Sequence, residues 1–279
     1  MNPSRIAYST LAFPDATLAE ATTLGRSWGY AGVELRLIDG QLIDSSVSAA
    51  ERVRVKQTIA AARLPIVSVD SSIILSAEGA GSEVRRFLEL ANDWESPLIR
   101  VYGGPLAEEP GTRHTQMAAA AVVLQKAIPH AERLGVAIAI ETHDSFSASS
   151  VVAELLAMVQ SKWVGALWDT HHPHRMGERP VEVYEHIGPR VLHVQVKDAR
   201  RSVAHKGGWQ LVPLGEGEVS VREIIRLLAV GGYGGYLSVE WEKYWHPNIE
   251  EPEVALPQHL KVLHEWIKDL ALEKGVPPN

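Results

Sequence analysis

The sequence predicts an α/β fold in which eight parallel strands close into a single (β/α)8, or TIM, barrel. Two observations lead to this prediction. Short runs that are apolar on both faces alternate with segments of helical periodicity along the 279 residues, which is typical of parallel strands covered by helices. Eight such strand–helix units can be counted, and eight is the number that a closed barrel requires.

The first half of the chain supplies four of these units. Each expected strand is a short apolar run, and each expected helix repeats its apolar residues every three or four positions. In the second helix Ser48 is the expected N-cap residue, and Glu51 stands three residues later in a capping-box pattern. The expected strands and helices alternate in the order Arg5–Ser9, Thr17–Gly29, Gly32–Arg36, Ser48–Arg63, Pro65–Asp70, Gly81–Glu95, Leu98–Gly103 and Thr112–Leu134.

The second half supplies the other four units. Gly135 is the expected stop of the long fourth helix. An open, doubly wound sheet is the alternative fold, but it would want a glycine-rich loop after the first strand, and the segment YSTLAFP contains no glycine. The expected elements continue in the order Val136–Asp144, Ser149–Gln160, Val164–Asp169, Pro180–Ile187, Val191–Val196, Ser220–Ala229, Leu237–Glu240 and Pro252–Leu272.

We expect residues 1–279 to form one domain, because no linker, low-complexity run or charge block marks a boundary. The regular spacing is interrupted once, by a long segment at residues 199–220 after the seventh strand. It contains Arg201, His205, Lys206 and Trp209. Long loops within a compact domain are usually functional or disordered, so we expect this one to cover the site.

Composition narrows the class of protein. A hydrophobic content of 46% is ample for a large core, and no apolar run reaches the roughly 18 residues of a membrane-spanning helix. The N-terminal segment has no long apolar stretch of signal-peptide type, and the absence of cysteine excludes disulfides and thiolate metal sites. The net charge of −7 argues against a nucleic-acid surface. We expect a cytoplasmic protein without a membrane or nucleic-acid partner.

Four consecutive strands end in oxygen-bearing side chains: Glu141, Asp169, Gln195 and Glu240. The carboxyl ends of barrel strands meet around one mouth, where such folds place their chemistry. Three carboxylates converging there would repel one another unless a cation lay between them. Carboxylate and amide oxygens suit Mg²⁺, Mn²⁺ or a similar divalent ion. An octahedral ion held by these four residues would keep two positions for a chelating substrate.

Histidines follow the same strand ends. His143 stands two residues beyond Glu141, and His172 lies in the dense segment HHPH, three residues beyond Asp169. We expect both to contact substrate, although a single histidine near a strand end can also be a structural hydrogen-bonding group. His193 precedes Gln195 by two residues, so it is expected to point into the barrel one layer deeper.

The segments ETHD, LWDTHH, LHVQVKDAR, PLGEGEV and SVEWE, with GYAGVELR and LIRVYGG upstream, carry a resemblance. Together they resemble the xylose isomerase-like family of TIM barrels, which includes sugar phosphate isomerases and epimerases. The resemblance implies that Glu141, Asp169, Gln195 and Glu240 bind one divalent ion, Mn²⁺ being favoured over Mg²⁺, Co²⁺ or Zn²⁺. It also implies that Glu141 and Glu240 move the proton.

The resemblance further implies that His172 and Arg201 hold substrate oxygens. In one respect the chain departs from the family's ketose epimerases, whose third ligand is usually histidine where this chain has Gln195. Glutamine at this position is similar to certain 3-dehydroshikimate dehydratases. Lys197 is expected near the metal, as an electrophile or paired with Asp198. Glu34 is expected to hold a distal hydroxyl of the substrate or an arginine.

The first functional hypothesis is a metal-dependent sugar or sugar phosphate isomerase or epimerase that abstracts an α-proton through a metal-stabilised enediolate. The second is a dehydratase of 3-dehydroshikimate or inosose type, in which His143 or His172 could serve as the acid. The third is a non-catalytic sugar-binding barrel. A DNA repair endonuclease on the same fold would want a multi-zinc site and a basic face, which the sequence lacks. The partner is a small carbohydrate or keto-acid; a homo-oligomer is compatible with the sequence.

Overall fold

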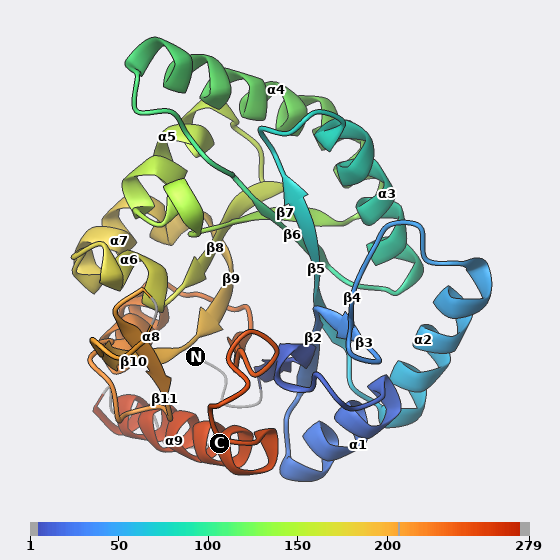
Figure 1. The fold of residues 1–279 in the computed structure, drawn as a ribbon, viewed down its shortest axis with the longest axis vertical. Coiled ribbons are helices and arrows are strands. Elements are labelled where there is room, and N and C mark those ends of the chain that lie inside the picture. Colours follow the sequence, from blue (N-terminus) through green and yellow to red (C-terminus); the bar gives the residue numbers. More distant parts are fainter. Residues whose placement is uncertain (1–4, 206, 274–279) are drawn as a thin grey trace.

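The computed structural model describes residues 5–205 and 207–273, and within them eight parallel strands close into a barrel (Figure 1). The predicted fold class is therefore confirmed. Each strand pairs with the strand that follows it in the barrel, and the last pairs with the first. In barrel order the strands are β1 (Ile6–Ser9), β2 (Gly32–Leu35), β5 (Ile66–Ile74), β6 (Leu98–Tyr102), β7 (Ala137–Glu141), β8 (Val164–Asp169), β9 (Val191–Val196) and β12 (Leu237–Val239).

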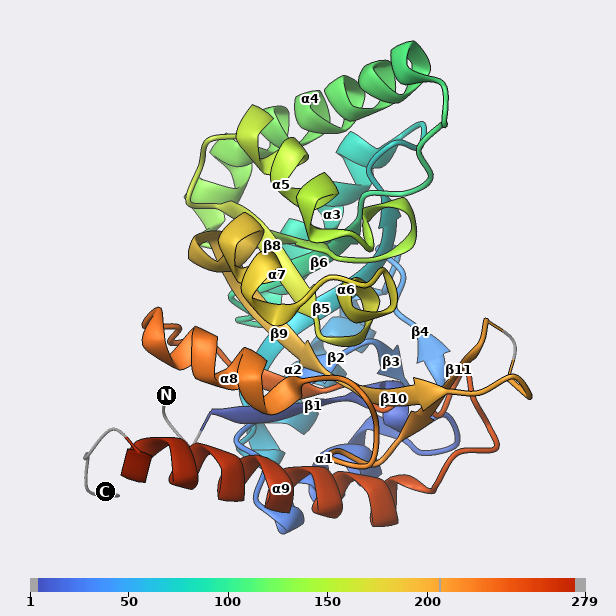
Figure 2. The same ribbon diagram turned by 90° about the vertical axis from the view of Figure 1, so that its left-hand side faces the viewer.

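Helices surround the barrel (Figures 1 and 2). Two predicted helix boundaries are confirmed: the Ser48 hydroxyl accepts a hydrogen bond from the backbone N–H of Glu51, and Gly135 ends the fourth helix in a left-handed conformation. The helices are α1 (Leu18–Trp28), α2 (Ala49–Ala62), α3 (Ala80–Asp93), α4 (Pro110–Leu134), α5 (Ser149–Met158), α6 (His171–Arg175), α7 (Pro180–Ile187), α8 (Val221–Val230) and α9 (Pro252–Glu273).

Successive side chains of a strand point to opposite faces, so alternate residues point toward the helices or into the barrel. On β8, Trp168 is buried in the large core cluster that includes helix residues, whereas Leu167 belongs to a separate small cluster with Leu98 and Ala139. Two residues beyond each member of that small cluster stands a polar side chain: Arg100, Glu141 or Asp169. An apolar layer inside the barrel therefore lies beneath a polar one, nearer the carboxyl ends of the strands.

Several short elements differ from the sequence prediction. The strand expected at Pro65–Asp70 continues to Ile74, with an irregular register against β6 beyond Asp70. The segment after β2 forms a small hairpin of β3 (Leu37–Ile38) and β4 (Gln41–Leu42). The helix α6 follows β8 directly. Among the described residues no helix is both long and apolar enough to cross a lipid bilayer.

The long segment at residues 199–220 is partly ordered as an antiparallel hairpin of β10 (Asp198–Arg201) and β11 (Trp209–Val212). Its base is held by the Asp198 carboxylate, which accepts backbone N–H bonds from the four residues Ala199, Gly215, Gly217 and Val219. A side chain at Gly217 would clash with this carboxylate. Lys206 lies outside the described residues.

Candidate functional site

The four side chains that the sequence nominates as metal ligands come together at one end of the barrel. Glu141 and Asp169 are the last residues of β7 and β8, Gln195 is paired with Asp169 across the β8–β9 ladder, and Glu240 follows β12. All four are at least 95% buried. Strand ends on neighbouring parallel strands bring them together, as expected for a barrel.

Each of these four residues has one buried oxygen without a hydrogen bond from the described part of the chain. The four atoms are Glu141 Oε2, Asp169 Oδ2, Gln195 Oε1 and Glu240 Oε2. Three of these oxygens lie beside buried side-chain cations described below, Glu141 Oε2 beside Arg100, and Asp169 Oδ2 and Glu240 Oε2 beside Lys197. Of the four, Gln195 Oε1 alone has neither a hydrogen bond nor an ion pair within the described chain. A hard divalent ion fits this donor set, because three carboxylates and an amide carbonyl supply only oxygen.

The amide of Gln195 is oriented by carboxylates on its nitrogen side. Its Nε2 donates to Glu34 Oε1 at 2.9 Å and to Glu240 Oε1 at 3.0 Å, and lies 3.4 Å from Asp70 Oδ2. Since an amide nitrogen only donates and its oxygen only accepts, this arrangement leaves Oε1 free. Gln195 thereby offers an oxygen where a histidine ligand would offer a nitrogen.

Glu34 lies below the metal-ligand candidates. Its Oε2 is 2.6 Å from His193 Nε2, and it is completely buried. Burial alone would raise the pKa of Glu34, but the contacts with His193 and Gln195 lower it to about 2. Within the described chain Glu34 contacts His193 and Gln195, and it does not line the cavity described below. Its expected contact with a substrate hydroxyl stays a prediction.

Lys197 carries a positive charge into the same cluster. Its Nζ lies 2.6 Å from Asp169 Oδ2 and 2.5 Å from Glu240 Oε2, and it also contacts Glu242. Burial would lower the pKa of this amine, but the three carboxylates outweigh burial and hold the pKa well above its usual value. Lys197 is therefore a permanent ammonium group beside two of the candidate ligands, and not a partner of Asp198.

Arg100, on β6, faces Glu141. Its Nη1 is 3.1 Å from Glu141 Oε2, its Nη2 is 3.7 Å from Asp70 Oδ2, and its guanidinium lies 4.1 Å from the centre of the Tyr102 ring. Burial raises the pKa of Glu141, an effect that Arg100 opposes. Burial, followed by the negative charge of Glu34, raises the pKa of Asp70 well above its usual value, in spite of Arg100.

A cavity of about 600 Å³ opens above these residues. Glu141 and Glu240 line it, whereas Asp169 and Gln195 lie beneath its surface. The hairpin contributes Trp209 and Leu211 to the wall. The whole lining consists of Leu11, Arg36, Ser72, Ile74, Arg100, Tyr102, Glu141, His143, Asp144, His171, His172, Arg175, Gly207, Trp209, Leu211, Glu240, Glu242, Trp245 and His246.

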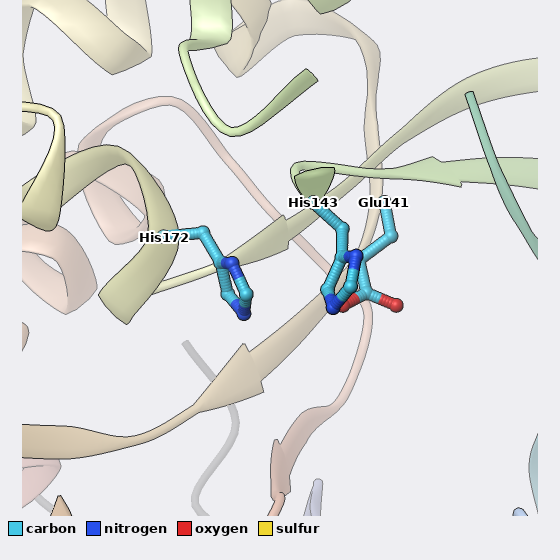
Figure 3. Close-up of side chains that lie close together, drawn as sticks. All are labelled: Glu141, His143 and His172. Carbon is cyan, nitrogen blue, oxygen red and sulfur yellow. The ribbon is translucent and has the colours of Figure 1, made fainter. Parts of the chain in front are cut away.

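His143 and His172 stand together on one wall of the cavity, beside Glu141 (Figure 3). The two rings are 4.6 Å apart, and one ligand atom from each of the three residues lies within 4.8 Å of the others. Burial and the nearby Lys197 charge lower the pKa of His172 well below its usual value, so its imidazole is neutral. Both histidines are thus placed to contact a molecule in the cavity.

Arg201 is the nominated residue that lies apart from the others. It is exposed on β10, its guanidinium is 4.9 Å from the Trp209 ring, and it does not line the cavity. Conversely, Arg36, Asp70, Arg100 and Tyr102 are absent from the predicted site, although all four lie at or near the ends of predicted strands. Alternation is the signal that identifies Arg100 and Tyr102, because two residues of the same strand separated by one point to the same side.

Comparison with curated proteins finds partial sequence matches. The chain is 28% identical over 134 residues to an inosose dehydratase of Clostridium botulinum (strain Eklund 17B / Type B), covering 43% of this chain and 42% of that protein. It is 32% identical over 119 residues to inosose dehydratase 1 of a Bacillus cereus strain, covering 38% and 39%. The matches span less than half the length of these relatives.

Solved structures share the fold at low identity. The chain is similar to a probable 3-DHS dehydratase, AsbF, from Bacillus anthracis (TM-score 0.71, 18% identity, 93% of this chain and 98% of that one). It is also similar to L-ribulose 3-epimerase (0.78, 16%, 98% and 97%). A third structure, the IOLI protein, holds a zinc atom (0.75, 14%, 96% and 98%).

A family model establishes the relationship. The model described as "Xylose isomerase-like TIM barrel" matches residues 23–269. Because the match extends over most of the chain, this protein belongs to the xylose isomerase-like TIM barrel family.

Proposed function

We propose that this protein is a divalent-metal-dependent enzyme that removes the proton next to the carbonyl of a small polyhydroxylated substrate and returns it to give an isomer or epimer. The observation that carries the proposal is the convergence of four buried oxygen-bearing side chains, Glu141, Asp169, Gln195 and Glu240, at a cavity large enough for such a molecule. Mn²⁺ is the favoured ion. The identity of the family supports the proposal at the level of enzyme class.

The residues divide the work by position. A bound divalent ion would supply an electrophile for the carbonyl and the adjoining hydroxyl. Of the four candidate ligands only Glu141 and Glu240 line the cavity, and they come from strands β7 and β12, which are not neighbours in the barrel. One carboxylate can therefore take the proton and the other can return it from a different direction. Asp169 and Gln195 would then act as metal ligands only.

The other cavity residues orient the substrate. His143 and His172 (Figure 3) line the cavity and reach the substrate hydroxyls, and Lys197 stabilises negative charge that develops near Glu240. We place the hairpin with Trp209 as the cover that excludes water. In this assignment Arg201 acts only if the hairpin moves toward the cavity.

Dehydration is the second candidate, and the His143–His172 pair favours it. Elimination of water needs an acid for the departing hydroxyl, and two imidazoles stand beside Glu141 in the cavity. The sequence similarity to inosose dehydratases points the same way. Proton removal is common to both reactions, so the fate of the carbanion separates them.

A proton-exchange experiment tests both candidates. Mn²⁺-loaded protein is incubated in D₂O with ketoses, ketose phosphates, inososes and 3-dehydroshikimate and followed by proton NMR. Deuterium beside the carbonyl with a new diastereomer or aldose supports isomerisation, and an unsaturated product supports dehydration. Metal uptake with neither exchange nor an unsaturated product from any of these substrates would count against both and favour the non-catalytic sugar-binding barrel.

A further inference from the structure

Arg36 is a buried cation at the edge of the cavity. It follows β2, is only 4% exposed, and lines the cavity together with Ser72 and Arg100. Its backbone N–H donates to Thr10 Oγ1 at 2.9 Å, so the main chain beneath it is fixed. A guanidinium remains charged under all ordinary conditions, and its burial therefore demands a partner.

The groups that accept hydrogen bonds from Arg36 are uncharged. Its Nη1 donates to the backbone carbonyl of Asp70 at 3.2 Å and to Ser72 Oγ at 3.0 Å. Within residues 5–205 and 207–273 no carboxylate lies at ion-pair distance from it, although the structure supplies ion pairs to the neighbouring buried cations Arg100 and Lys197. A buried charge without a counter-ion is costly. Burial and the proximity of Arg100 accordingly lower the pKa of Arg36.

The unpartnered edge of Arg36 faces accessible space. Only Nη1 is engaged, and Nε and Nη2 make no hydrogen bond to the described residues, yet neither is among the buried atoms sealed off without a partner. Nε and Nη2 form the planar fork that binds two oxygens of a carboxylate or phosphate. Because Nη1 is tethered, the orientation of this fork is restricted, and Arg36 lines the cavity.

We propose that Arg36 is the binding site for an oxyanion carried by the substrate, a carboxylate or a phosphate ester. The inference deepens the proposed function and rests on it for the assumption that substrate enters this cavity. It selects, from the carbohydrates and keto-acids considered above, those with a negative charge at one end. The oxyanion of the bound substrate then serves as the counter-ion of Arg36 and neutralises the charge of its guanidinium.

The other cavity cations are less suited to this role. Arg100 already faces Glu141 and Asp70, and Lys197 is surrounded by three carboxylates. Arg175 lines the cavity but is exposed, so water solvates its charge, and its Nη2 donates to Ser147 Oγ at 3.3 Å. Arg36 alone among these four combines burial with the absence of an ion pair within the described chain.

Calorimetric binding of unreactive probes tests the inference. Shikimate is compared with its uncharged methyl ester on the Mn²⁺-loaded protein and on the protein treated with a chelator. We expect shikimate to bind about 10- to 100-fold more tightly than the ester, in both forms. The variant Arg36→Met is expected to reduce this preference to less than about twofold, whereas the control Arg200→Met, on an exposed hairpin position, should retain it.

Two further comparisons identify the source of the oxyanion. Inorganic phosphate, and fructose 6-phosphate against fructose, are titrated in the same way. Tighter binding of the phosphates assigns a phosphate ester, and tighter binding of shikimate assigns a carboxylate. Should Arg36→Met fail to fold, Arg36→Lys, which keeps the charge but lacks the fork, is expected to weaken binding of the preferred anion about tenfold.

The inference is overturned if the wild type binds shikimate no more tightly than its ester and fructose 6-phosphate no more tightly than fructose, if Arg36→Met keeps the preference for the anion, or if Arg36→Lys binds as tightly as the wild type. An anion that binds only to the metal-loaded form, equally in Arg36→Met, would be a metal ligand instead. These measurements involve no turnover. A protein without proton exchange but with an Arg36-dependent anion preference would refute the proposed reaction and leave the anion site standing.

Discussion

At the level of individual residues, the main feature of the site is which of its charged and polar side chains have partners. Lys197 forms ion pairs with Asp169, Glu240 and Glu242, and Arg100 faces Glu141. Oxygens remain without hydrogen bonds on all four candidate ligands. Three of the four candidate ligands are therefore already paired with side-chain cations, and the amide oxygen of Gln195 has no partner within the described chain.

Neutral isosteres of the two cavity carboxylates test their role as proton-transfer groups. Glu141→Gln and Glu240→Gln keep an oxygen for the metal but remove the base, so the rate of proton exchange is expected to fall about 100- to 10,000-fold. Deuterium incorporation measured with saturating Mn²⁺ checks this. The exposed Glu108→Gln is the matched control, and exchange at wild-type rate in both cavity variants would reject the assignment.

Removal of the Lys197 charge should make stability depend strongly on metal. In Lys197→Met the carboxylates of Asp169, Glu240 and Glu242 lose their shared cation, and we expect the free energy of unfolding without metal to fall by about 3 kcal/mol. A divalent ion restores positive charge to Asp169 and Glu240, so the loss should shrink with Mn²⁺ present. Urea denaturation with chelator and with Mn²⁺ measures both values. An equal loss under the two conditions would contradict this account.

At the level of secondary structure, the candidate functional residues stand at the ends of strands, whereas the helices contribute mainly to packing. The C-terminal helix α9 packs against α1, α8 and β1, and its His259 is buried with its ring centre 5.3 Å from that of Trp241. His259 Nδ1 is 2.7 Å from the Ala255 carbonyl oxygen. Burial lowers the pKa of His259 to about 4, so the helix docks with a neutral imidazole.

This histidine makes the stability of the protein fall at mildly acidic pH. Its pKa is about 4 in the folded chain and about 6.5 when unfolded, so the unfolded state binds the proton first. Its contribution is complete above pH 6.5 and is lost as pH falls toward 4, by about 3 kcal/mol. His259→Gln should flatten that part of the profile in urea denaturation, and His264→Gln, at an exposed position on α9, should not.

For the molecule as a whole, the barrel brings residues from distant parts of the chain to one mouth. Glu34 and His193 are 159 positions apart and in direct contact. A frame of eight hydrogen-bonded strands holds the candidate ligands without requiring the ion to build the fold. Metal binding is therefore expected to add to stability and not to create it.

Metal addition and removal test this expectation. With Mn²⁺ at 100 times its Kd the native state should gain about 2.7 kcal/mol, seen as a higher midpoint of thermal unfolding that a chelator reverses. Asp169→Asn should reduce the gain because it weakens one ligand. A wild-type midpoint that does not respond to Mn²⁺, Mg²⁺, Co²⁺ or Zn²⁺ would mean that the four candidate ligands do not bind a divalent ion.

The alternation of strands and helices, the closed barrel and the meeting of Glu141, Asp169, Gln195 and Glu240 at its mouth could be predicted from the sequence, because periodicity and strand ends are local properties that survive folding. The helix boundaries at Ser48 and Gly135 were predictable for the same reason. The pairing of the charged side chains could not be predicted in this way. The sequence places Lys197 beside Asp198 or the metal, whereas its contacts with Asp169, Glu240 and Glu242 depend on three separate strands.

The orientation of the Gln195 amide, the burial of Glu34 beneath it, and the exposed position of Arg201 on a hairpin emerge only in the folded chain. The same is true of Arg36, which is buried without a carboxylate partner among the described residues. These properties arise from contacts between residues far apart in sequence. The energy of a charge depends on its surroundings, and those surroundings exist only once the barrel has closed.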